Sequence, residues 1–187
     1  MISGRRLRRL DRRDQLLAAA TRAFARNGFE ATNLDDVAEE AGISKVLLYR
    51  HFDSKADLYR AVLERSMTHL ATKVGEGEFT WESVVALLRA AAEDPDGFRL
   101  LFHHAAREPE FRAELDRLRA SSVAVARRQL ARRIRDRAWA DWAAELAPTV
   151  AVDAVIAWLD AGQPDPEKAA QGIGRVLAAI VEAAEAR

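Results

Sequence analysis

The chain has 187 residues, and its 29 basic and 29 acidic side chains give a formal net charge of zero. The absence of cysteine excludes disulfides and thiolate metal sites, and the four histidines lack the spacing of a zinc site. No apolar run approaches the roughly 18 residues of a membrane span, and the Arg-rich start lacks the apolar core of a signal peptide. We therefore expect a cytoplasmic protein that uses no metal, cofactor or membrane.

The first 13 residues concentrate positive charge, because six arginines stand there against one acid, Asp11. If this segment is helical, four of the arginines share one face: Arg5, Arg8, Arg9 and Arg12. Two interpretations stay open. The arm is either a solvated tail or a contact to the DNA backbone or minor groove.

Frequent alanines and the near absence of Val, Ile and Thr clusters favour an all-α fold. Apolar residues at helical spacing predict four helices in the first part of the chain, over 11–27, 34–41, 44–52 and 54–70. Gly28 and Gly42 suit the positive φ that ends a helix. Asn33, Ser44 and Ser54 are typical N-cap residues for the helices that follow them.

Beyond the glycines at 75 and 77, the pattern predicts five more helices, over 80–92, 96–106, 109–135, 140–161 and 166–185. Pro148 either kinks the fourth of these or marks its start. We expect two helical domains, a smaller one over residues 1–60 and a larger one over 61–187. The border between them then lies within the helix 54–70.

Residues 34–52 have the pattern of a helix-turn-helix. Two short helices that cross steeply need a small residue at the crossing, which Ala38 supplies, and Gly42 permits the tight turn between them. Leu48 and Phe52 can bury against the first helix. The outward surface of the second helix then carries Lys45, Val46, Leu47, Tyr49 and Arg50. A helix of this size fits the major groove of DNA, and an unrelated helical bundle is the alternative.

The stretch from Asp11 to Leu63 resembles the DNA-binding domain of the tetracycline-repressor (TetR) family. The matching motifs are Ala23-Phe24, Asn27-Gly28-Phe29, Ala31-Thr32, Val37 to Ser44, Leu48 to Phe52 and Lys55 to Leu58. The resemblance implies that backbone phosphates are contacted by Thr32, Ser44, Tyr49, His51 and Lys55. It implies that base edges are contacted by Lys45, Leu47 and Arg50. Asn33 is a further DNA-binding candidate.

One residue departs from the family pattern, which usually has Gly or Ala where this chain has Val46. A branched side chain at this position either contacts a thymine methyl group or holds the helix farther from the groove. The operator of a relative therefore does not transfer directly to this chain.

The second domain matches the family only in its expected architecture, a helical bundle with a ligand cavity. Large and polar side chains there are candidates for the cavity: Trp81, Arg89, Phe98, Phe102, His103, His104, Arg107, Trp142 and Trp158. Most of the aromatic ones can equally belong to an ordinary core. His103 and His104 are adjacent, so on a helix they point about 100° apart and cannot easily chelate one ion.

The last two predicted helices carry apolar and small residues that favour a four-helix interface between two protomers. A homodimer would bind a palindromic operator, and a small, largely apolar ligand would release it as a repressor. A ligand-independent activator or architectural protein is the alternative. No nucleophile–base pair, paired carboxylates or phosphate-binding glycine loop is recognisable, so we do not expect an enzyme.

Overall fold

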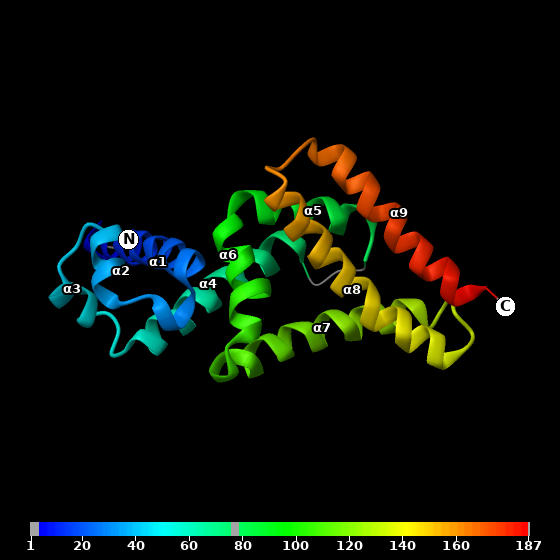
Figure 1. The fold of residues 1–187 in the computed structure, drawn as a ribbon, viewed down its shortest axis with the longest axis horizontal. Helices are drawn as coiled ribbons and strands as arrows, with labels where there is room; N and C mark the ends of the chain where they lie inside the picture. Colours follow the sequence, from blue (N-terminus) through cyan, green and yellow to red (C-terminus); the bar gives the residue numbers. More distant parts are fainter. Residues whose placement is uncertain (1–3, 76–78, 187) are drawn as a thin grey trace. The chain divides into compact units, whose positions relative to one another are not determined.

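The computed structural model describes residues 4–75 and 79–186, and these ranges contain only helices and turns (Figure 1). The helices are α1 (Gly4–Ala31), α2 (Leu34–Glu40), α3 (Lys45–Tyr49), α4 (Lys55–Val74), α5 (Trp81–Glu93), α6 (Pro95–Arg99), α7 (Arg112–Leu130), α8 (Arg137–Asp160) and α9 (Pro166–Glu185). The all-α prediction is confirmed. The bounds of α9 coincide with the predicted range.

Two compact units divide the chain. The N-terminal unit comprises Met1–Thr68 with Asp96–Phe111, and the C-terminal unit comprises His69–Pro95 with Arg112–Arg187. The division at Thr68 lies within α4, whereas the sequence placed it between residues 60 and 61. The larger difference is the segment 96–111, which the prediction assigned to the second domain and the structure assigns to the first.

A cluster of aromatic rings explains why residues 96–111 belong to the N-terminal unit. The Phe111 ring lies 4.5 Å from the Tyr59 ring and 4.9 Å from the Phe29 ring, measured between centroids. Tyr59 also packs edge-on against Phe24 at 4.8 Å. Burial raises the pKa of the Tyr59 phenol well above its ordinary value. The packing of Phe111 on Phe29 and Tyr59 therefore holds the segment 96–111 in the N-terminal unit, although it lies far from residues 1–68 in the sequence.

Helix α1 begins at Gly4, seven residues before the predicted start at 11. Its regular part ends where predicted, because Gly28 has a φ of 75° and interrupts the helical geometry. The side chains of residues 1–12 lie outside the described part of the structure. The DNA contact expected for the arginine arm therefore stays a prediction.

The segment predicted as one helix over 96–106 has three local geometries. Helix α6 continues into a π-helical turn over Leu100–His104 and a 3-10 turn over Ala105–Arg107. A second 3-10 turn over Pro109–Phe111 precedes α7. Leu100, Leu101 and Ala105 are all buried. The hydrophobic pattern predicted a helix here, but it does not distinguish α from π or 3-10 hydrogen bonding.

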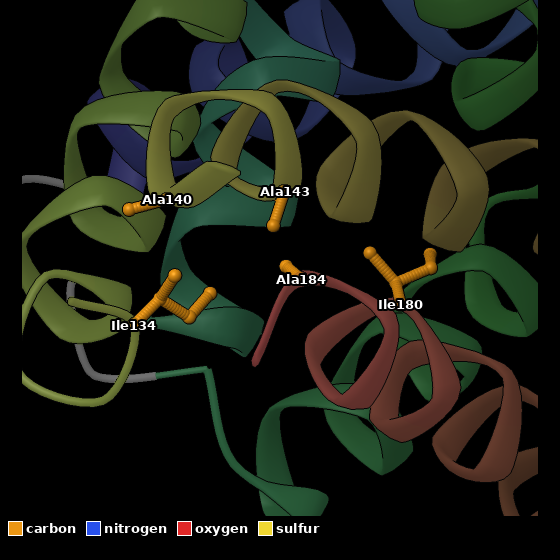
Figure 2. Packing of buried hydrophobic residues seen from close by; sticks show 5 residues of the cluster. All are labelled: Ile134, Ala140, Ala143, Ile180 and Ala184. Atoms are coloured by element: carbon orange, nitrogen blue, oxygen red, sulfur yellow. The ribbon is translucent and has the colours of Figure 1, made fainter. Parts of the chain in front are cut away.

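The C-terminal unit is a bundle in which α8 packs against α5, α7 and α9. Asp136 and Asp165 cap α8 and α9, each accepting two backbone N–H groups at the helix start. Pro148 lies inside α8 and is buried, and the helix continues through it. Figure 2 shows one core cluster of this unit, in which Ala143 on α8 faces Ala184 on α9 beside Ile134, Ala140 and Ile180.

By length and composition alone, α8 could cross a membrane, since an 18-residue window within it has a mean hydropathy of 1.4. Charged residues such as Asp141, Glu145 and Asp153 interrupt its apolar sequence. In the structure α8 runs beside α9 and packs against it (Figure 1), and 39% of the apolar window is buried.

Candidate nucleic-acid interface

The first helix of the helix-turn-helix begins at a complete capping box. The Asn33 side chain accepts hydrogen bonds from the backbone N–H groups of Asp35 and Asp36, at 2.8 and 2.9 Å. The Asp36 carboxylate in turn accepts the Asn33 N–H at 3.3 Å. These contacts satisfy the free donors at the start of α2. The predicted N-cap is confirmed, and its side-chain oxygen is occupied within the chain.

The turn between α2 and α3 has the predicted chemistry. Gly42 has a φ of 64°, which a residue with a side chain adopts only under strain. The Ile43 N–H donates to the Ala38 carbonyl at 3.0 Å and closes the turn. Ser44 then caps α3 by accepting the Leu47 N–H at 3.3 Å. The Gly42 backbone conformation and the hydrogen bond from Ile43 to Ala38 orient α3 relative to α2.

Helix α3 has one buried and one exposed side. Leu48 is 1% exposed and anchors the helix, whereas Val46 is 68% exposed and Tyr49 is 49% exposed. Lys45 and Arg50 are also exposed, while Leu47 and His51 are half-buried. The outward residues named from the sequence thus lie on the open side of α3, with Leu47 less accessible than the others.

Lys45 already has a partner within the domain. Its ammonium group donates to the Asp35 carboxylate at 2.8 Å, and this hydrogen bond raises the pKa of Lys45. Both side chains are about half exposed or more, so water screens the pair. An ammonium group has three N–H donors, so this ion pair alone does not prevent a contact to DNA.

Thr32 has a structural role that the sequence did not indicate. The Thr32 side chain is buried, and its hydroxyl donates to the Gly28 carbonyl at 2.7 Å. It thereby satisfies a carbonyl at the end of α1, where the helical hydrogen bonds stop. A buried hydroxyl cannot reach a phosphate, so the structure does not support the expected phosphate contact by this side chain.

Lys55 is also engaged inside the N-terminal unit. Its ammonium group donates to the carbonyls of Phe29 and Glu30, at 2.8 and 3.1 Å, and lies 4.5 Å from the centre of the Phe29 ring. The charge at this end of α1 also suits the helix dipole. Two of its three N–H groups are therefore committed to the fold rather than to DNA.

One ion-pair network was missed by sequence reasoning. Glu40, at the end of α2, accepts from Arg22 at 2.8 Å and from Arg26 at 2.6 Å. These hydrogen bonds lower the pKa of the Glu40 carboxyl. Arg22 and Arg26 are four residues apart on α1, so they share a face. That spacing was visible in the sequence, but their partner was not.

Of the ligand candidates in the second domain, Trp81 alone is among the described residues that line the cavity of about 820 Å³ found in the C-terminal unit. Five others belong to the N-terminal unit instead: Phe98, Phe102, His103, His104 and Arg107. The Phe98 and Phe102 rings pack on one another at 4.8 Å, and burial lowers the pKa of His104. These residues were misplaced because segment 96–111 was assigned to the wrong unit.

The remaining candidates lie away from the cavity wall. Arg89 is exposed on α5. Trp142 packs edge-on against Trp139 at 5.5 Å, and each is 42% exposed. Trp158 is buried, and its indole N–H donates to the Pro164 carbonyl. That contact ties α8 to the turn before α9, so Trp158 has a structural role.

The helix-turn-helix and its surroundings identify the family. Residues 16–62 match the family model described as bacterial regulatory proteins, tetR family. This stretch of the chain is a TetR-family domain, so the family prediction made from the sequence motifs is confirmed for these residues.

Two curated relatives match the N-terminal part of the chain. One is the HTH-type transcriptional activator FasR of Mycolicibacterium smegmatis, 41% identical over 109 residues, which are 54% of this chain and 50% of the relative. The other is the HTH-type transcriptional repressor AcnR of Corynebacterium efficiens, 30% identical over 108 residues, which are 54% of this chain and 55% of the relative. The chain thus spans about half the length of these relatives.

Solved structures extend the likeness to the whole TetR-type fold. A TetR-like regulator from Rhodococcus sp. RHA1 has a TM-score of 0.78 with 19% identity, covering 91% of this chain and 93% of that one. FadR from Bacillus subtilis, in complex with stearoyl-CoA, has a TM-score of 0.66 with 16% identity, covering 89% of this chain and 96% of that one. At these identities the likeness shows the fold.

Proposed function

We propose that the chain is a DNA-binding transcriptional regulator whose helix α3 enters the major groove. The observation that carries this proposal is the exposed side of α3, held outward by buried Leu48, within a TetR-family domain. In this proposal the N-terminal unit binds DNA, and the C-terminal unit binds an effector and forms a dimer in the cytoplasm. Selection of duplexes from a random DNA pool tests the proposal, and failure to enrich any sequence would refute it.

A homodimer through α8 and α9 is part of this proposal. Val176 on α9 is 50% exposed, and the same face carries Gly172, Ala179 and Ala183, which permit close approach of a second copy. Two-fold symmetry then requires a palindromic operator with half-sites about one helical turn, or a multiple of it, apart. The selected sequences should therefore contain inverted repeats.

An effector that binds the C-terminal unit completes the proposal. Its cavity of about 820 Å³ is within the size range of ligand pockets, and the structural relative FadR is known with stearoyl-CoA. We expect the effector to lower DNA affinity and so relieve repression; the relative AcnR is named a repressor. The relative FasR is named an activator, so a reporter gene behind the selected operator must decide the direction.

Variants of Tyr49 and Lys55 are expected to have different effects, because Tyr49 is proposed to contact DNA whereas Lys55 supports the fold. Tyr49→Ala should weaken binding to every duplex by about 10-fold through one lost phosphate hydrogen bond, without changing the free energy of unfolding. Lys55→Met should lower that free energy by about 1–3 kcal/mol and leave the salt dependence of DNA affinity unchanged. Mobility shifts at several salt concentrations and urea unfolding measure both. If Lys55→Met reduced the slope of log affinity against log salt concentration by about one, Lys55 would contact a DNA phosphate after all.

Val46 is expected to contact the methyl group of a thymine. Replacing that thymine by deoxyuridine in the selected operator should weaken binding about 3- to 5-fold, because one buried methyl is worth roughly 0.8 kcal/mol. Val46→Ala should abolish the difference between the two duplexes, as titrations in a two-by-two design would show. An equal loss in both proteins would assign the methyl contact to another residue.

A further inference from the structure

The cavity of the C-terminal unit combines an apolar wall with arginines. Its apolar wall includes Trp81 at the start of α5 and Leu177 and Val181 on α9. Phe79 and Trp81 line it while remaining 42% and 45% exposed. Large aromatic side chains left open at a cavity wall offer apolar area to a ligand.

Two contacts hold this aromatic wall in place. The Phe79 backbone N–H donates to the Gln129 side chain of α7 at 2.9 Å. Gly174 on α9 lies directly against the Trp81 ring, since a Cβ at that position would come within 3.3 Å of the ring. The wall is thus attached to both α7 and α9. A preformed wall lowers the ordering cost of binding.

The charged side chains among the described lining residues are arginines, and they differ in the ion pairs that they form. The described lining residues include Arg132, Arg133 and Arg175 and no acidic residue. Arg133 pairs with Glu185 at 3.0 Å. Arg175, in contrast, forms no ion pair with any residue in the described part of the chain. A guanidinium group beside an apolar wall suits a carboxylate or a similar acid on an apolar body.

We infer that this cavity binds an organic anion, with its apolar body on Phe79 and Trp81 and its acidic group paired with Arg175. The inference rests on the proposed function, in which the C-terminal unit holds the effector. It specifies the largely apolar ligand predicted from the sequence as one that also carries a negative charge. The cavity can exclude cations and distinguish an acid from the corresponding alcohol.

Calorimetric titration with dodecanoate and with 1-dodecanol tests this inference on the full chain. Dodecanoate should bind about 10- to 100-fold more tightly than the alcohol, in line with a charge-assisted hydrogen bond. Arg175→Gln should remove that preference and leave binding of the alcohol unchanged. Arg175→Lys should retain part of it. The matched control is Arg128→Gln, an exposed arginine of α7 that is not among the described lining residues, and it should keep the preference.

Each outcome decides the inference. Equal affinity for acid and alcohol, or an undiminished preference in Arg175→Gln, would overturn it. Absence of binding by both probes would also overturn it. Selection and mobility-shift assays on ligand-free protein report separately on the proposed function, because Arg175 lies in the C-terminal unit and not in the helix-turn-helix. If the titrations fail to show the preference for dodecanoate while the protein still binds DNA, the inference is refuted and the proposed DNA-binding function is not.

Discussion

Replacing Ile180 by aspartate is expected to lower the free energy of unfolding by about 4 kcal/mol or more. Ile180 is 9% exposed and packs within the chain's own core, against Ala143 and Ala184 among others (Figure 2). The substitution removes apolar burial and places an unpaired carboxylate in that core. Tryptophan fluorescence during urea unfolding reports this directly, because all four tryptophans belong to the C-terminal unit.

Val176→Asp is the matched control on the same helix. Val176 lies about one turn before Ile180 but is 50% exposed, so the new carboxylate stays in water within a monomer. We expect this variant to unfold at nearly the same urea concentration and to dissociate the proposed dimer, as light scattering would show. A stable, folded Ile180→Asp protein would contradict the core assignment. A dimeric Val176→Asp protein would place the interface elsewhere.

Replacing Phe111 by alanine is expected to destabilise the N-terminal unit by about 3–5 kcal/mol. The Phe111 side chain is fully buried, and its ring contacts Phe29 and Tyr59. Truncation leaves a cavity between helices that only partly relax. Circular dichroism during urea unfolding should show an earlier transition than in the parent chain. The DNA affinity should fall with the folded fraction.

Phe79→Ala supplies the control for this prediction. The same atoms are removed, but Phe79 is 42% exposed and belongs to the C-terminal unit. We expect a change in stability below about 1 kcal/mol. If Phe111→Ala were as mild as Phe79→Ala, the segment 96–111 would not contribute to the core of the helix-turn-helix unit.

The local features of the helix-turn-helix were predictable because each depends on residues a few positions apart. Asn33 and Ser44 cap helices through N–H groups two or three residues ahead. Gly28 and Gly42 take the positive φ that their positions require. The outward side of α3 follows from helical periodicity once Leu48 is buried. For such features, the sequence contains both partners of the interaction in one short window.

The roles of Thr32 and Lys55 could not be predicted in the same way. Both residue types are common at DNA backbones, and local pattern favours that function. For Lys55 the hydrogen-bonded carbonyl of Phe29 is 26 positions away, and a contact over that separation depends on how the helices pack. Thr32 donates to a carbonyl only four positions away, but the burial that keeps its hydroxyl from a phosphate again depends on packing between helices.

The sequence alone determined the all-α class, the TetR-family domain and the side of α3 that is exposed. These follow from propensity, capping and periodicity, which act within a few residues. The tertiary structure alone decided that segment 96–111 joins the N-terminal unit and that Ile180 lies in the core. It also decided that Trp81 shares a cavity with Arg175. The physical reason is that these arrangements depend on burial between elements far apart in the chain.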